Sequence, residues 1–143
     1  MALAVINSEE ITHYIAHQEP ILMVNNLKIL NKNQGLSSFQ IPPANIFLNC
    51  SATMTQEGYL EHIAQSSAAM IGFFQEKTIV GYIGEISDCC LFSCDAKVGD
   101  CITTEITVLY EFEKVFLISA TSSVDHKKIV DCKMKLSINN DTK

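Results

Sequence analysis

One glutamate is of chemical interest because the predicted helix around it consists mainly of small and apolar residues. Glu61 and Gln65 lie one turn apart in the segment Glu61-His62-Ile63-Ala64-Gln65, so a helix places both side chains on one face. Packing that removes a carboxyl group from water raises its pKa and favours proton transfer, with Gln65 placed to orient the carboxylate. The spacing alone favours a plainer interpretation, a first-turn acid near the positive end of the helix dipole.

Histidines and cysteines are the other side chains suited to chemistry. His62 follows Glu61 by about 100° around the helix, so it points elsewhere, and we expect it in packing or at an interface. His17 belongs to a polar N-terminal segment, and no two histidines have the spacing of metal ligands on one helix. We therefore expect no metal site and no cofactor. The cysteines also lack a zinc-binding pattern, and we expect free thiols at Cys50, Cys89, Cys90, Cys94, Cys101 and Cys132.

The composition describes one folded domain, residues 1–143. Hydrophobic residues make up 48% and charged residues 18%, which is enough apolar material for a core. The net charge is -6 and every cationic side chain is lysine, so bidentate arginine contacts are absent and we expect no nucleic-acid partner. No apolar run approaches the roughly 20 residues of a membrane span. The apolar residues 1–6 carry no basic leader, and we expect a cytoplasmic protein.

The first half of the chain predicts a short helix, a hairpin and one long helix. The short helix begins with Ser8 as its cap and ends before Pro20. The apolar residues 21–30 and the alternating residues 36–41 are predicted strands joined by a turn. Residues 56–75 carry apolar side chains spaced by three and four on more than one face, around a slim middle of small residues. This pattern is typical of a buried helix.

The second half alternates between apolar and polar residues, which predicts an antiparallel sheet with one buried face. Short apolar runs at 79–86 and 89–94 precede three long alternating segments, 102–112, 116–124 and 130–138. A sheet buries a single helix in so small a chain when it curls around that helix. We therefore predict an α+β hot-dog fold, a curved antiparallel sheet wrapped around one long central helix. The uncovered edge of such a sheet predicts at least a dimer.

Three segments resemble, in chain order, motifs of the hot-dog 3-hydroxyacyl-(acyl-carrier-protein) dehydratases. Residues 16–24 (AHQEPILMV) are similar to the opening L-P-H-R-x-P-x-L-L-V-D of that family. Residues 58–65 (GYLEHIAQ) resemble its central-helix signature E-x-x-A-Q, which carries the catalytic carboxylate. Residues 98–100 (VGD) are similar to the x-G-D turn before its long strands. The matches span most of the chain, and the resemblance implies that Glu61 is the catalytic carboxylate.

The resemblance is incomplete in the loop before the central helix. The dehydratases carry a catalytic histidine there, in the motif G-H-F-P-G, whereas residues 46–54 contain no histidine, proline or glycine. This shorter loop is similar to that of the divergent dehydratase-like proteins of aryl-polyene and related pigment clusters. In the family, histidine and carboxylate come from different subunits. Because the loop histidine is missing here, the resemblance carries over only the carboxylate, Glu61. His17 matches a family position outside the catalytic loop, and Asn49 and Cys50 lie near the place of the loop histidine, where either would orient substrate or water.

The resemblance implies an acyl thioester, on an acyl carrier protein or coenzyme A, as substrate. A dehydratase would remove water from a 3-hydroxyacyl thioester in a fatty-acid or polyene type of pathway, with Glu61 as acid and base. Gly58, at the helix N-terminus, would let the thioester oxygen approach backbone N–H groups. A hot-dog thioesterase, in which the helix carboxylate activates water, needs no histidine. A non-catalytic subunit that pairs with an active dehydratase homologue would explain the missing histidine.

For the dimer, we expect the partner of this chain to be either a second copy or a related hot-dog subunit. An acidic carrier protein would need a local basic surface on this acidic chain. The candidates lie near the last predicted hairpin, where a solvated strand face is the plainer interpretation: Lys127, Lys128, Lys133 and Lys135.

Overall fold

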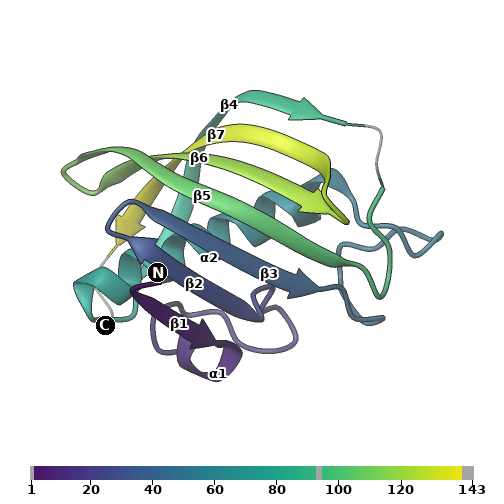
Figure 1. Ribbon diagram of the computed structural model, residues 1–143, viewed down its shortest axis with the longest axis horizontal. Helices are drawn as coiled ribbons and strands as arrows, with labels where there is room; N and C mark the ends of the chain where they lie inside the picture. The colour runs from purple at the N-terminus through teal and green to yellow at the C-terminus, as the bar shows by residue number, and fades with distance from the viewer. Residues whose placement is uncertain (1, 93–94, 140–143) are drawn as a thin grey trace.

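One curved antiparallel sheet surrounds one long helix in the computed structural model of the protein, which describes residues 2–92 and 95–139 (Figure 1). Within these residues the sheet has seven strands in the order β1-β2-β3-β5-β6-β7-β4. This architecture confirms the predicted α+β arrangement. The elements are β1 (Ala4–Asn7), α1 (Ser8–Ile11), β2 (Asn26–Asn31), β3 (Gln34–Gln40), α2 (Gln56–Gln75), β4 (Val80–Leu91), β5 (Cys101–Phe112), β6 (Val115–Val124) and β7 (Lys127–Asn139).

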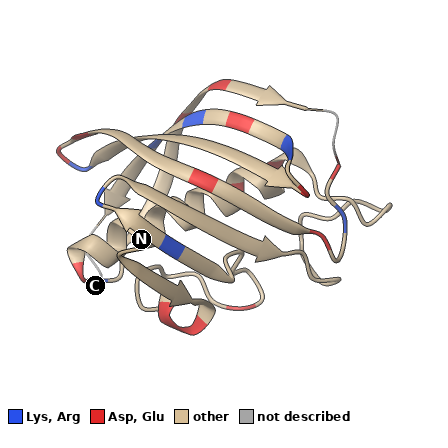
Figure 2. Ribbon diagram, viewed as in Figure 1, with Lys and Arg blue, Asp and Glu red and all other residues tan. Residues whose placement is uncertain are grey.

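Alternation along the last two strands shows which face of the sheet is buried. The even-numbered residues from Phe116 to Val124 in β6 are all buried, and so are those from Val130 to Ile138 in β7. The charged residues between them, Asp131, Lys133 and Lys135, belong to the outer face, where acidic and basic residues are mixed (Figure 2). The predicted alternating segments are therefore confirmed for β6 and β7.

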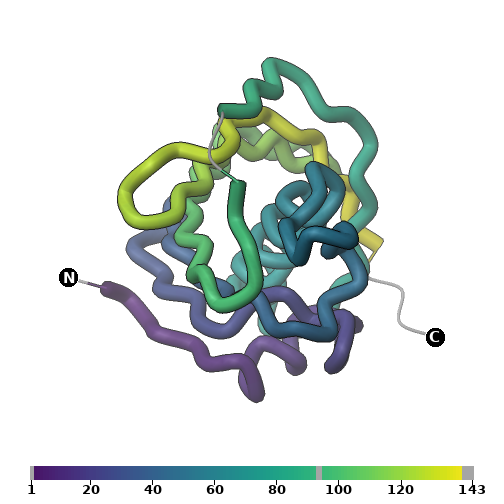
Figure 3. Tube along the Cα trace, turned by 90° about the vertical axis from the view of Figure 1, so that its right-hand side faces the viewer, coloured from purple at the N-terminus to yellow at the C-terminus, as the bar shows by residue number. Residues whose placement is uncertain are grey.

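The central helix α2 has the bounds that the sequence predicts. Between Gly58 and Gly72 its side chains are buried on every face, apart from Leu60 and Glu61. Figure 3 shows the strands curling around the helix, which the small residues of its middle turns keep slim. In the described part of the chain, neither α2 nor another helix combines the length and apolarity needed to cross a membrane.

The predicted strand over residues 21–30 begins only at Asn26. The residues before it are irregular, although most of them are buried. The backbone of Met23 bonds to Gln65 and His62 of α2, whereas the Asn25 N–H donates to the Ser38 carbonyl of β3. Hydrophobicity predicts burial for this segment, but it does not reveal which partner takes the backbone hydrogen bonds.

The N-terminal elements also differ from the prediction. The short strand β1, which the sequence did not predict, pairs with β2. The cap of α1 is Asn7 instead of Ser8: the Asn7 side chain accepts from the Glu10 N–H at 3.0 Å, and the Glu10 carboxylate accepts from the Asn7 N–H at 3.2 Å. This reciprocal capping box satisfies two backbone donors at the start of the helix.

Bulges explain two further differences. The runs 79–86 and 89–94 were predicted as separate strands, but one strand, β4, continues through register shifts against β7. Cys94 lies outside the described residues. In β5 the predicted buried stripe ends at Ile106. Val108 is half-buried, a register shift follows it, and Tyr110 and Phe112 are exposed.

Strand β4 is an edge of the sheet with an exposed apolar surface. It is hydrogen-bonded to β7 on one side only. The exposed apolar side chains on it include Tyr82, which is 58% exposed, together with Ile83, Ile86 and Leu91. An apolar edge strand of this length is a template for pairing with another chain.

Candidate functional site

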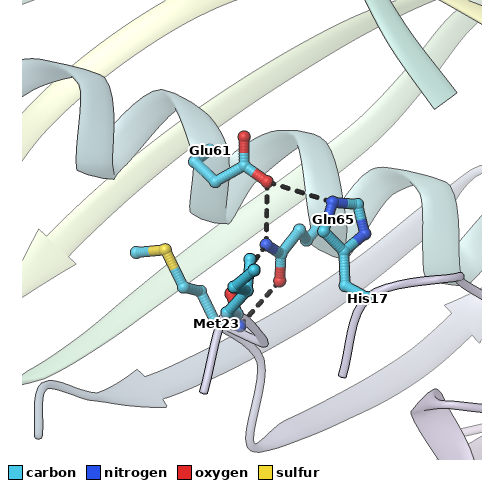
Figure 4. Close-up of polar contacts among 5 residues, drawn as sticks. His17, Met23, Glu61 and Gln65 are labelled. Atoms are coloured by element: carbon cyan, nitrogen blue, oxygen red, sulfur yellow. Dashed lines mark hydrogen bonds and ion pairs between the residues drawn. The ribbon is translucent and has the colours of Figure 1, made fainter. Parts of the chain in front are cut away.

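A carboxylate, an imidazole and an amide meet beside the first turns of α2 (Figure 4). Glu61 Oε2 lies 3.3 Å from His17 Nε2 and accepts a 2.8 Å hydrogen bond from Gln65 Nε2. The side chains of Glu61 and His17 are 27% and 32% exposed, so both are partly withdrawn from water. The other carboxylate oxygen, Oε1, takes part in neither contact. The structure thus adds His17 to Glu61 and Gln65, which the sequence analysis placed together on one helix face.

Gln65 is held at both ends of its amide. Besides the bond to Glu61, Nε2 donates to the Ile21 carbonyl at 3.1 Å, and Oε1 accepts from the Met23 N–H at 2.6 Å. Gln65 is 1% exposed, so water does not compete for these groups. The two contacts with Ile21 and Met23 fasten the segment between His17 and β2 to the helix, and this segment carries His17 to Glu61.

The pKa of Glu61 is lowered from its ordinary value. The hydrogen bond from His17 is the main cause, the bond from Gln65 and the charge of His17 act in the same direction, and burial opposes them. The sequence analysis expected a raised pKa from desolvation on an apolar helix. That expectation is wrong in direction, because the hydrogen bonds from His17, on a distant segment, and from Gln65 outweigh the partial burial. Glu61 is therefore ionised at neutral pH.

His62 points away from Glu61 and is sealed from water at 0% exposure. Its Nδ1 lies 2.7 Å from the Met23 carbonyl oxygen, its Nε2 lies 2.9 Å from Thr104 Oγ1, and its ring stacks on Phe39. Burial lowers the pKa of His62 to about 4, so the imidazole is neutral at pH 7. Packing was expected for this residue, but its hydrogen bonds were missed. No local signal shows them, since the partners lie 39 and 42 residues away in the chain.

A hollow of about 190 Å³ lies beside the Glu61 carboxylate, between α2 and the edge strand β4. Small residues create it, because Ala64, Ala68 and Gly81 leave space that larger side chains would fill. A larger and more open depression, of about 690 Å³ beside α1, contains neither Glu61 nor His17. The hollow beside Glu61 is lined by His17, Glu61, Ala64, Gln65, Ala68, Gly81, Tyr82 and Ile83.

The other predicted substrate residues lie outside this hollow. Gly58 is buried, and a Cβ atom there would come within 2.6 Å of Met54 Cγ and 2.8 Å of Phe47 Cβ, so the missing side chain makes room for packing. The Asn49 side chain accepts hydrogen bonds from two backbone N–H groups of the turn that follows it. Cys50 is exposed. Roles for Gly58, Asn49 and Cys50 at the substrate stay predictions.

Three of the four lysines proposed as a basic surface have an acidic neighbour. Each of these charges is therefore at least partly compensated, and acidic and basic residues are mixed on the described part of the outer face (Figure 2). The ion pairs join Lys128 to Asp131 at 3.3 Å, Lys135 to Glu85 at 3.4 Å and Lys133 to Asp88 at 3.8 Å.

The cysteines contribute no disulfide within the described residues. Cys50, Cys89, Cys90, Cys101 and Cys132 are free thiols. Over the same part of the chain, no three histidine, cysteine or acidic side chains gather in a way that would hold a metal ion.

No protein-family model matches the sequence, and no curated protein matches it. Several solved structures are similar to the protein. The dehydratase heterocomplex ApeI:P from Xenorhabdus doucetiae is similar with a TM-score of 0.82 at 14% identity, over 92% of both chains. A hypothetical thioesterase with coenzyme A from Streptococcus pneumoniae TIGR4 is similar with a TM-score of 0.61 at 9% identity, over 80% of this chain and 84% of that one. The PaaI protein of the E. coli phenylacetic acid degradation operon is similar with a TM-score of 0.62 at 8% identity, over 78% and 80%.

At such low identity these similarities concern the backbone. They agree with the seven antiparallel strands, the order of elements and the single enclosed helix described above. The chain therefore has the hot-dog fold.

Proposed function

We propose that the protein acts on acyl thioesters and removes water from 3-hydroxyacyl thioesters, with Glu61 and His17 as its acid–base pair. The observation that carries this proposal is the 3.3 Å contact between His17 Nε2 and Glu61 Oε2 beside the hollow. Dehydration needs an acid and a base within reach of one substrate. The loop before α2 lacks the histidine of the dehydratases, and His17 supplies an imidazole from the same subunit as the carboxylate.

The pair accounts for each proton in the reaction. Ionised Glu61 takes the proton from the carbon next to the thioester carbonyl. The electron pair left behind forms the carbon–carbon double bond while the carbon–oxygen bond breaks. Protonated His17 gives its proton to the departing hydroxyl group, which leaves as water. Proton transfer from Glu61 back to His17 then restores the starting pair, so the products are an enoyl thioester and water.

The hollow provides the place for the acyl chain. Ala64 and Ala68 follow Glu61 along α2 at intervals of three and four residues, so they share the helix face that carries the carboxylate. An apolar acyl chain would lie along these small residues with its reactive end at Glu61. The same chemistry serves thioesters of coenzyme A and of a carrier protein. Coenzyme A thioesters are the substrates to try first, because the lysines are paired with carboxylates.

A second hot-dog subunit, identical or related, would dock on β4. Tyr82 and Ile83 belong both to this exposed edge strand and to the lining of the hollow. Pairing along β4 would therefore bury the apolar edge and shield the hollow from water in the same step. The dehydratase heterocomplex ApeI:P is an assembly of different chains, which supports testing both a homodimer and a heterodimer.

Thioester hydrolysis is the second candidate, and the lowered pKa of Glu61 favours it. A carboxylate that is ionised at neutral pH can activate water for attack on the thioester carbon, and His17 is not required as an acid at that step. Two of the similar structures, at TM-scores of 0.61 and 0.62, are not named as dehydratases. One of them is named a hypothetical thioesterase.

The experiment gives the purified protein 3-hydroxyacyl and plain acyl coenzyme A thioesters of equal length. Formation of the enoyl thioester supports dehydration, and release of free thiol supports hydrolysis. Glu61→Gln should lower either activity by at least about 100-fold, because it removes the base while keeping its shape. His17→Gln should lower dehydration by a similar factor. His13→Gln, the same change at an exposed histidine of the same segment, should leave the rate unchanged.

Two outcomes would contradict the proposal. Full activity of Glu61→Gln would remove the carboxylate from the mechanism. Inactivity toward both substrates, together with activity once a related hot-dog chain is added and insensitivity to Glu61→Gln in that complex, would assign the chain to a non-catalytic subunit.

A further inference from the structure

We propose that His62 is a positioning residue: as the neutral Nδ1–H tautomer it holds the backbone of Met23, which in turn keeps the Gln65 amide turned so that it donates to Glu61. The hydrogen bonds run from β5 to His62 on α2, then through Met23, and back to α2 at Gln65 and the Glu61 carboxylate. The catalytic consequence rests on the function proposed above, whereas the tautomer and the effect on Glu61 are properties of the protein without substrate.

The hydrogen-bond partners determine where the His62 proton lies. The Met23 carbonyl oxygen, 2.7 Å away, only accepts, so Nδ1 must donate. A neutral imidazole has one N–H, so Nε2 accepts from the Thr104 hydroxyl at 2.9 Å. The Thr104 oxygen then accepts from the Ser122 hydroxyl at 2.7 Å. Each donor in this buried chain has one acceptor, and reversing any bond would leave two acceptors facing each other.

Among the residues that the structure describes, none places a charge against the imidazole that would favour a second proton. The groups packed on it are the Phe39 ring from β3, the Thr104 hydroxyl from β5 and the Met23 carbonyl. The carboxylate of its neighbour Glu61 on α2 is bound to His17 and Gln65 instead. Thr104 and Ser122 are 0% exposed, so water does not enter this network.

Met23 passes the constraint from His62 to Gln65. Its carbonyl is held by the imidazole, and its N–H donates to Gln65 Oε1 at 2.6 Å. Because Oε1 takes this bond, the NH₂ group of the amide must face the other way, toward the Ile21 carbonyl and Glu61 Oε2. A flipped amide would place an oxygen against both acceptors and an NH₂ group against the Met23 N–H.

Two matched substitutions of His62 distinguish a role in positioning Gln65 from a role in packing alone. His62→Asn keeps an N–H donor at the Nδ1 position, whereas His62→Leu has nearly the same shape and no donor. We expect the Glu61 pKa to stay unchanged in His62→Asn and to rise in His62→Leu by the shift that Gln65→Met produces. Carboxyl ¹³C NMR titration measures this shift without substrate. A role in packing alone would cost stability in the leucine variant but would not move the Glu61 pKa.

Nitrogen NMR of the unaltered protein tests the tautomer even where a variant fails to fold. The expected spectrum shows His62 protonated at Nδ1 and unprotonated at Nε2, without titration from about pH 5 to about pH 8. Protonation at Nε2, titration within that range, or a Glu61 pKa that stays unchanged in a folded His62→Leu variant would overturn the proposal. Where the thioester activity is present, kcat should fall about tenfold in His62→Leu with KM little changed, and His62→Asn should restore it. An absent activity with the NMR results intact would reject the proposed function alone.

Discussion

At Glu61, hydrogen bonding and burial act on one carboxyl group in opposite directions. Burial alone would raise the pKa, and it is the only raising cause at this residue. Gln65 is a contact within one helix turn, so the sequence predicts it, but the larger effect comes from His17, on a separate segment. The direction of the pKa shift therefore depends on a contact that helix periodicity does not contain.

Replacing His17 with phenylalanine should raise the pKa of Glu61, because the change removes the largest lowering cause and leaves burial in place. A ¹³C NMR titration of the Glu61 carboxyl measures this shift. His13→Phe, which alters an exposed histidine of the same segment, should leave the titration unchanged. An unaltered Glu61 pKa in His17→Phe would show that the pair does not form in solution.

The buried imidazole of His62 should make stability depend on pH. Its pKa is about 4 in the folded protein against 6.5 for an ordinary histidine, so the unfolded chain takes up a proton first as the pH falls. Stability is then lost between these two values, by about 3 kcal/mol, and it is fully present above the upper one. His62→Asn removes this titration, so urea denaturation should show a smaller loss on acidification. Equal losses in both proteins would contradict a neutral buried imidazole.

At the scale of elements, two adjacent serines of α2 face different surroundings. Ser66 and Ser67 are both 0% exposed. Ser66 shares a 2.6 Å hydrogen bond with Ser37 of β3, whereas the Ser67 hydroxyl has no hydrogen-bond partner among the described residues. The helix pattern gives the two residues the same interpretation, as small residues of a buried helix, and only the packing of β3 against α2 distinguishes them.

Ser66→Ala should therefore destabilise the protein by about 1–3 kcal/mol, since it leaves the buried Ser37 hydroxyl without its partner. Ser67→Ala should be neutral or should stabilise it by up to about 1 kcal/mol, because it removes a buried unpaired hydroxyl and alanine favours the helix. The two variants control for each other in a comparison of urea midpoints. If Ser67→Ala were as destabilised as Ser66→Ala, the Ser67 hydroxyl would have a hydrogen-bond partner in the folded protein.

At the scale of the whole molecule, the sheet ends in two different edges. β1 is a short edge strand, while β4 is long and carries exposed apolar side chains next to the hollow. The proposed docking of a second subunit on β4 follows from this difference, and it connects assembly to the site, since Ile83 belongs to both.

Light scattering after size exclusion should therefore find a dimer, and Ile83→Lys should convert it to a monomer, because a lysine there would be buried without a partner in the paired edge. Val5→Lys places the same charge on the opposite edge strand, at a residue that is 57% exposed, and should leave the dimer intact. A dimer that persists in Ile83→Lys and breaks in Val5→Lys would move the interface to β1.

The local periodicity of apolar residues was sufficient to predict much of the fold. The spacing of apolar residues predicted α2 with its observed bounds, and alternation predicted the buried faces of β6 and β7, because both patterns arise within single elements. Residues 21–25 show the limit of this reasoning: their apolar character predicted a strand, but α2 side chains bond to the backbone of Ile21 and Met23.

The amino-acid sequence by itself determined that a carboxylate and an amide share one face of a slim, buried helix enclosed by an antiparallel sheet. Only the tertiary structure decided that His17 reaches Glu61, that the pKa of this carboxyl group falls, and that His62 bonds to Met23 and Thr104. The physical reason is the distance along the chain between the residues in contact. Helix and strand patterns depend on neighbours a few residues away, whereas these contacts join distant segments and exist only once the sheet has closed around α2.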